Sequence, residues 1–111
     1  MNQGHIKSGE VVNLETLREE MDVDASYALV KTEDMEVIRM AVHKGKTIDE
    51  HNIEGEMTVQ CLKGDILFMV DGNARELKPG DWLYLQKKQN FSYSVKEDTI
   101  LLVTILFTVE S

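Results

Sequence analysis

From Ser26 onward, short apolar segments alternate with turn-forming residues, and this rhythm sets the fold class. The turns are Lys44-Gly45, Lys63-Gly64-Asp65, Asp71-Gly72-Asn73 and Lys78-Pro79-Gly80-Asp81. Glycine and asparagine tolerate positive φ angles, and proline presets φ at the first corner of a turn. Turns at intervals of roughly 8–12 residues are typical of antiparallel sandwiches and barrels. The sequence therefore predicts an all-β fold.

The apolar segments between these turns are the predicted strands. They are residues 27–31, 37–43, 57–62, 66–70, 74–77, 82–85, 91–95 and 99–109. In front of them we expect one short helix, capped by Asn13, with Leu14, Leu17 and Met21 on one face. A helix of about two turns is not stable alone, so it has to rest on another element.

The last predicted strand, residues 99–109, is apolar at every position except its threonines. An antiparallel strand with one wet face would alternate between apolar and polar residues. This strand therefore needs cover on both faces, either from the same chain or from a partner subunit. We expect a homodimer, because twofold dimers are the commonest closed assembly.

Length, charge and cysteine content limit the classes of protein that the chain can belong to. With 111 residues, it is expected to form one domain, residues 1–111. Its net charge of −8 repels phosphate backbones and anionic lipids, so we expect neither nucleic acid nor a membrane as partner. Cys61 is the sole cysteine, and the first ten residues lack the apolar stretch of a signal peptide. A cytoplasmic location is therefore expected.

The middle of the chain resembles the cupin superfamily. In the first cupin motif, a glycine is followed after five residues by His-x-His, then by a glutamate and a closing glycine. Here Gly45 is followed after five residues by His51, and residues 56–64 are similar to the motif's second strand and closing turn. The second motif begins with Gly-Asp, here Gly80 and Asp81 after a typical Leu-Lys-Pro approach.

The resemblance covers residues 35–108, behind an N-terminal extension over residues 1–25. It points in particular to short single-domain bacterial cupins with a His-x-x-x-Gly-acid segment, here His51 to Glu56. It implies a double-stranded β-helix, that is, an RmlC-like jelly-roll barrel with a short N-terminal helical segment. It also implies pairing of two copies through their sheets.

The resemblance implies a metal held by three histidines and one glutamate, but the sequence departs from that set. By spacing, the first histidine is His51, whereas Ile53, Met57 and Phe91 replace the second histidine, the glutamate and the third histidine. Isoleucine and phenylalanine have no lone pair, and methionine is a weak, soft ligand. Catalytic centres typically need about three protein ligands. We therefore expect no cofactor and no bound Fe, Zn, Mn or Ni.

The predicted ligand pocket lies where the family keeps its metal. Positions 51, 53, 57 and 61 share the parity of the family's inward-facing ligands. The candidate residues are His51, Ile53, Glu56, Met57, Cys61 and Phe91. Such a pocket is mainly apolar with one polar end, which favours a small apolar organic molecule with a single hydrogen-bonding group. The alternative is that Phe91 fills the barrel and leaves no cavity.

Several candidates have a second interpretation. His51 can be a structural side chain at the rim of the pocket. Together with Met57 and Cys61 it would also suit Cu(I), although core packing explains the two sulfur residues better. Glu54 and Glu56 share a face, and we expect exposed acids there, with a pocket hydrogen-bond acceptor at Glu56 as the alternative.

Two further sets of residues have open assignments. Arg39 and His43 share a face of one strand, which can meet solvent or the pocket, and solvent is favoured. Two aromatic pairs share strand faces, and core packing is favoured over pocket lining. These pairs are Trp82 with Tyr84 and Phe91 with Tyr93.

These features favour a non-catalytic barrel that binds a small molecule. One alternative is a cupin enzyme, isomerase- or oxygenase-like, that uses His51 and Glu56 or a non-standard metal. Another is a structural or regulatory partner protein whose sheet surface is the working part. Metal content separates the enzyme from the binding module, and a stable complex in pull-down experiments would favour the partner protein.

Overall fold

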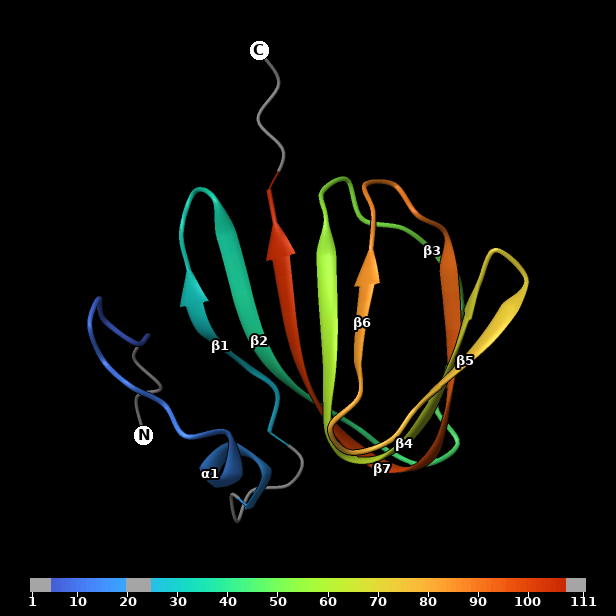
Figure 1. The fold of residues 1–111 in the computed structure, drawn as a ribbon, viewed down its shortest axis with the longest axis horizontal. Coiled ribbons are helices and arrows are strands. Elements are labelled where there is room, and N and C mark those ends of the chain that lie inside the picture. The colour runs from blue at the N-terminus through green and yellow to red at the C-terminus, as the bar shows by residue number, and fades with distance from the viewer. Residues whose placement is uncertain (1–4, 20–24, 108–111) are drawn as a thin grey trace.

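The computed structural model describes residues 5–19 and 25–107, and over these residues the chain is almost all β (Figure 1). One helix precedes seven strands in this part of the chain. The elements are α1 (Leu14–Glu19), β1 (Tyr27–Lys31), β2 (Met35–Val42), β3 (Thr47–His51), β4 (Met57–Val70), β5 (Asn73–Leu77), β6 (Trp82–Leu85) and β7 (Phe91–Leu106). The predicted all-β architecture with a short N-terminal helix is confirmed. None of the described helical residues forms a span that could cross a membrane.

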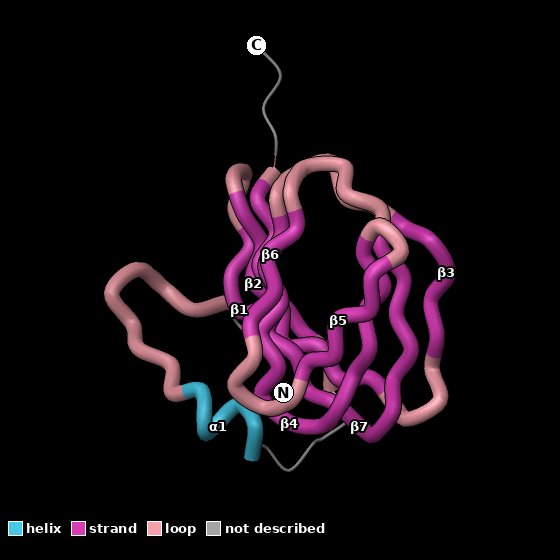
Figure 2. Tube along the Cα trace, turned by 45° about the vertical axis from the view of Figure 1, so that its right-hand side comes forward, coloured by secondary structure: helices cyan, strands magenta, loops and turns pink. Residues whose placement is uncertain are grey.

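The long strands β4 and β7 bend, and each contributes to two sheets. In the first sheet, β1, β2, the second half of β7, the first half of β4 and β6 are neighbours. In the second sheet, β3, the first half of β7, the second half of β4 and β5 are neighbours. All of these pairs are antiparallel, and the two sheets close into a barrel (Figure 2).

The predicted turn at residues 63–65 is wrong, because β4 runs through it. Its register against β7 shifts three times between Cys61 and Ile66, so the strand bends without ending. Gly64 has a φ of 100°, and a Cβ there would lie 2.4 Å from the carbonyl oxygen of Asp98. Glycine is therefore needed at this position because the two bent strands β4 and β7 approach each other closely. The predicted strands 91–95 and 99–109 likewise form one strand, β7, whose described part ends at Leu106.

Strand β3 was not predicted from the sequence. Its residues, Thr-Ile-Asp-Glu-His, do not alternate between apolar and polar, and all but Ile48 are exposed. It is an edge strand that pairs with β7, with Thr47 opposite Ser94 and His51 opposite Phe91. Edge strands of this kind carry charged residues that discourage pairing with other chains, which removes the apolar signal.

The main core lies between the two sheets. Its fully buried members come from both sheets and include Val59, Cys61, Ile66, Phe68, Leu101 and Val103. A second, smaller core lies on the outer face of the first sheet, where Leu17 of α1 packs with Leu29, Leu62 and Ile100. The outer face of the apolar strand is therefore covered at Ile100 by helix α1 of the same chain.

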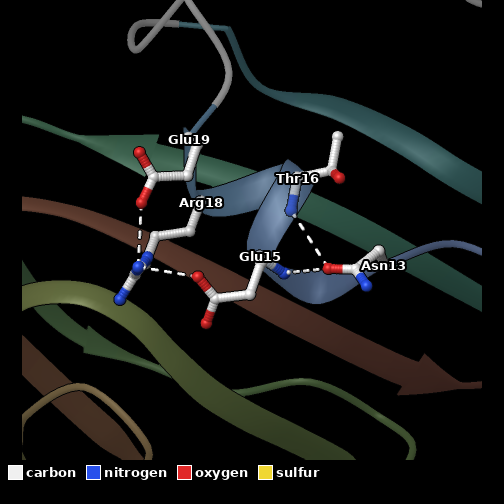
Figure 3. A network of polar contacts seen from close by, with 5 residues as sticks. All are labelled: Asn13, Glu15, Thr16, Arg18 and Glu19. Atoms are coloured by element: carbon white, nitrogen blue, oxygen red, sulfur yellow. Dashed lines mark hydrogen bonds and ion pairs between the residues drawn. The ribbon is translucent and has the colours of Figure 1, made fainter.

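Helix α1 begins after Asn13, as predicted. The Asn13 Oδ1 accepts hydrogen bonds from the backbone N–H groups of Glu15 at 2.8 Å and Thr16 at 3.3 Å (Figure 3). In the same view, the Arg18 guanidinium contacts the carboxylates of Glu15 and Glu19. Leu17 is buried and Leu14 is partly exposed, whereas Met21 lies outside the described residues.

The solvent assignment of Arg39 is wrong, because its side chain is 0% exposed. Its Nε donates to the carbonyl oxygen of Leu17 at 3.0 Å, and its Nη1 donates to that of Ala25 at 2.5 Å. The guanidinium also lies 5.9 Å from the centre of the Tyr27 ring. The N-terminal segment covers this face of β2, so Arg39 contacts protein where solvent was expected. His43, by contrast, is exposed as predicted.

Candidate functional site

The two ends of the barrel differ in how completely they are closed. We call the mouth the upper end in Figure 1, where β3 and β6 end and β7 begins. At the opposite end, Ile66, Leu77, Val95 and Leu101 are at most 4% exposed and Val42 is 8% exposed, whereas Met40 is half-buried. Toward the mouth, several apolar side chains pack against the core and yet remain partly exposed; they are Ile53, Val70, Tyr93 and Ile105.

His51 lies at the mouth, at the end of β3, and its side chain is exposed. The planes of the His51 and Phe91 rings are perpendicular, and the ring centres lie 5.8 Å apart. Ile53 follows in the next loop, and its carbonyl oxygen accepts a hydrogen bond from the backbone N–H of Lys88 at 2.9 Å. This bond ties the loop after β3 to the loop before β7. Three of the predicted pocket residues, His51, Ile53 and Phe91, thus lie near one end of the barrel.

Phe91 is 4% exposed and belongs to the aromatic part of the core. Its ring centre lies 5.9 Å from that of Phe68, which in turn lies 5.4 Å from that of Tyr93. Such tilted contacts at this distance are favourable beyond the burial of area alone. Core packing is therefore confirmed for Phe91, which fills space below the mouth.

Glu56 makes its side-chain hydrogen bond to Tyr84, whose hydroxyl donates to the carboxylate. This bond to a carboxylate raises the pKa of Tyr84. The two residues border a mainly apolar cavity of about 110 Å³. Its lining is Glu56, Met57, Thr58, Tyr84, Thr104 and Leu106. The sequence expectation placed Glu56 near His51, whereas its hydrogen bond here points toward Tyr84.

Core packing is wrong for the Trp82–Tyr84 pair. Trp82 is 61% exposed and Tyr84 is 50% exposed. Both lie on the outer face of the edge strand β6, opposite Gln60 and Thr58 of β4. The smaller core gathers around Leu17, Leu62 and Ile100, and these two aromatic residues are not among its members.

The residues at the family's metal positions do not fit that metal. Ile53 and Phe91 present only carbon, and Met57 presents a buried thioether. Among residues 5–19 and 25–107, no three His, Cys, Asp or Glu side chains come together. His51 is thus the sole strong donor at these four positions.

The arrangement also does not suit a shared Cu(I) site. Met57 and Cys61 are four residues apart on β4, which corresponds to roughly 13 Å along an extended strand. Val59 lies between them on the same face and is fully buried. Burial raises the pKa of the Cys61 thiol to about 11, and the thiol donates to the carbonyl oxygen of Lys63. The thiol is thus bonded to the backbone of its own strand and is separated from Met57 by Val59.

Two residues on the inner face of the second sheet were missed in the sequence. Arg75 lies directly opposite Phe68, and Asn73 lies opposite Val70. Their strand, β5, is mostly exposed, so neither residue stands out by hydrophobic pattern. One signal could have found them. Leu77 is buried, and residues 73 and 75 lie on the same face of the strand because side chains two positions apart point the same way.

Comparisons of the structure with solved structures identify the fold. No family model matches the chain, and no curated protein matches its sequence. A conserved protein of unknown function from Streptococcus pyogenes is 21% identical, with a TM-score of 0.76 and coverage of 96% of this chain and 95% of that chain. A cupin superfamily protein from Desulfitobacterium hafniense is 15% identical, with a TM-score of 0.75 and coverage of 94% and 95%.

An RmlC-like cupin from Shewanella frigidimarina is 18% identical, with a TM-score of 0.70 and coverage of 77% of each chain. At these identities the likeness concerns the fold. The resemblance drawn from the sequence is therefore confirmed at the level of fold: the chain has the jelly-roll barrel of the cupin superfamily.

Proposed function

We propose that the chain is a non-catalytic barrel that binds a small organic molecule at its mouth. One observation carries this proposal: the inward-facing apolar side chains Ile53, Val70 and Ile105 remain partly exposed at the mouth, where the exposed His51 also lies. Ligand sites in proteins are typically concave, mainly apolar and equipped with a few polar groups. The mouths of β-barrels are a common place for them.

The polar group of this site is His51. Within the described residues its ring contacts Phe91, and no hydrogen bond joins its nitrogens to another side chain or to the backbone. A neutral imidazole offers one donor and one acceptor, so His51 can bind a polar group of a ligand whose body lies against Ile53 and Val70. We further propose a cytoplasmic location, on the argument from cysteine content given above.

A binding role is favoured over catalysis by the chemistry of the donors. His51 has no second strong donor at the three replaced metal positions, and the Glu56 carboxylate is engaged by the Tyr84 hydroxyl. A general acid–base pair needs both groups within reach of the same substrate atom or a neighbouring one.

A fragment screen tests the proposal. Wild-type protein, His51→Ala and His43→Ala are screened against small apolar compounds by ligand-observed NMR and by thermal shift. His43 is the matched control, because it is an exposed histidine beside Asp98, away from Phe91. We expect hits on the wild type that weaken in His51→Ala and persist in His43→Ala. A wild-type protein that binds no fragment, or hits that ignore both substitutions, would contradict a site at the mouth.

We also propose a homodimer that pairs through the outer face of the first sheet. Large side chains are exposed there; they are Trp82 at 61%, Tyr84 at 50% and Leu106 at 42%. Uncharged Thr58, Gln60 and Thr104 lie between them on β4 and β7. Apart from the Glu56 carboxylate, which is bonded to Tyr84, these residues are uncharged. In a chain of net charge −8, such a face is one on which two copies can meet with little repulsion.

A further inference from the structure

Two rows of side chains cross the inner face of the second sheet near the mouth. Strand register aligns the upper row as His51, Phe91, Val70 and Asn73. It aligns the row below as Ile48, Tyr93, Phe68 and Arg75. Residues directly opposite each other in antiparallel strands project from the same face. Because Phe68 and Phe91 belong to the main core, both rows face the inside of the barrel.

Arg75 places a permanent positive charge at the edge of this face. It is exposed, and within the described residues its guanidinium makes one hydrogen bond, 3.3 Å long, to the carbonyl oxygen of Ala74. None of the ion pairs among those residues involves it. A guanidinium binds a carboxylate through two parallel hydrogen bonds.

Tyr93 supplies a second donor in the same row. Its ring lies 5.4 Å from that of Phe68, which separates it from Arg75 in the register. No hydrogen bond joins the Tyr93 hydroxyl to any residue that the structure describes. Burial raises the pKa of Tyr93, so the hydroxyl keeps its proton and can donate. A guanidinium and a phenol thus lie on either side of Phe68, which is itself buried in the core.

We propose that the mouth binds a small carboxylate, whose charged group is held by Arg75 and Tyr93 and whose apolar body lies against the half-buried Val70. The inference rests on the proposed binding function and narrows its ligand to an anion. Hydrogen bonds to charged groups are worth more than neutral ones, so the charge of the ligand should decide its affinity.

Matched pairs of probes that differ only in charge provide the test. Benzoate is compared with benzamide, and cyclohexanecarboxylate with cyclohexanecarboxamide, by chemical-shift titration of the isotope-labelled protein. On the wild type we expect each acid to bind about tenfold more tightly than its amide. Arg75→Gln should remove this preference, because the acid loses more affinity than the amide does. Lys96→Gln, which removes the same charge from an exposed site beyond Val95 on β7, should leave both affinities unchanged.

The outcomes separate this inference from the proposed function. If the amides bind the wild type as tightly as the acids, the preference for an anion is wrong and the binding function stands. If Lys96→Gln weakens acid binding as much as Arg75→Gln does, the effect is one of net charge and the inference is again wrong. If neither these probes nor any screened fragment binds, both proposals fail. Because Arg75 is exposed, an unchanged melting temperature is expected for Arg75→Gln.

Discussion

Arg39 donates a hydrogen bond from its Nε to the carbonyl oxygen of Leu17, and this bond joins strand β2 to the N-terminal helix. A second bond from the same guanidinium reaches the carbonyl oxygen of Ala25. One accepting carbonyl belongs to α1 and the other to Ala25, so one buried cation ties both of these parts of the chain to β2. The smaller core around Leu17 depends on this placement.

Replacing Arg39 by methionine is therefore expected to destabilise the chain. Arg39→Met keeps much of the apolar stem but leaves two carbonyl oxygens without their charged donor, and each such loss costs about 1–3 kcal/mol. We expect the free energy of unfolding, measured by urea denaturation, to fall by roughly 2–4 kcal/mol. Arg18→Met is the control, since the ion pairs of Arg18 are on the surface and are worth at most about 1 kcal/mol. Equal effects of the two substitutions would contradict the anchoring role of Arg39.

Gly64 should be intolerant of any side chain. Its φ of 100° is unfavourable for other residues, and a Cβ would lie 2.4 Å from the Asp98 carbonyl oxygen and 2.6 Å from the Thr99 Cα. Gly64→Ala is expected to cost about 3 kcal/mol or more, because rigid backbone atoms of β7 have to move. Gly72→Ala also has a positive φ but meets open space, so its cost should stay near 1–2 kcal/mol. Urea denaturation of both variants checks the difference, and a Gly64→Ala cost no larger than that of Gly72→Ala would be evidence against the close contact.

Phe91→Ala distinguishes a core residue from a pocket lining. Phe91 contacts Phe68 and is 4% exposed, so its truncation should cost about 3–5 kcal/mol and leave a hole below the mouth. The same substitution at Phe107, which is 38% exposed, should change stability by no more than about 1 kcal/mol. Thermal and urea unfolding of the two variants give the comparison. A small cost at Phe91, together with altered fragment binding, would instead indicate that the ring lines an open cavity.

Cys61 gives a pH-dependent prediction. Burial raises the pKa of its thiol from an ordinary value of 9.0 to about 11. The folded state therefore favours the neutral thiol, and its contribution to stability is complete below pH 9 and is lost as the pH rises toward 11. We expect the stability of the wild type to fall more steeply over that range than the stability of Cys61→Val, which has no thiol. If the two proteins lost stability equally between pH 9 and 11, the thiol would ionise as easily in the folded chain as in the unfolded one.

The sequence predicted the fold well because the signals involved are local. Glycine, proline and asparagine at the turns, and the apolar segments between them that are now seen as β2, β4 and β7, were sufficient to predict an antiparallel sandwich or barrel. The bend of β4 was read as a turn because Gly64 looks the same whether a chain reverses or two strands approach closely. Strand β3 was missed because its polar edge residues carry no apolar pattern.

The candidate site was less predictable, since it depends on pairing between distant strands. Parity within one strand placed Met57 and Cys61 inside the barrel, as observed. It did not show that Arg39 lies beneath the N-terminal segment, or that Arg75 shares a row with Tyr93, because both facts require the register of other strands. The hydrogen bond of Glu56 to Tyr84 also joins two strands that are far apart in the sequence.

The proposed homodimer gives the last prediction. The exposed Trp82 and Tyr84 face outward from β6, beside uncharged Gln60 and Thr58 of β4. Large aromatic side chains at the centre of an interface contribute most of its binding energy, and a charge placed there costs several kcal/mol when it is buried. Light scattering at micromolar concentration should therefore give about twice the chain mass of 12.7 kDa for the wild type. Trp82→Glu should shift the protein toward the single-chain mass, whereas Val11→Glu, at a side chain that is 93% exposed in the N-terminal segment, should not. A wild type that scatters as one chain would rule out a stable dimer. A dimer unaffected by Trp82→Glu would place the interface on another face.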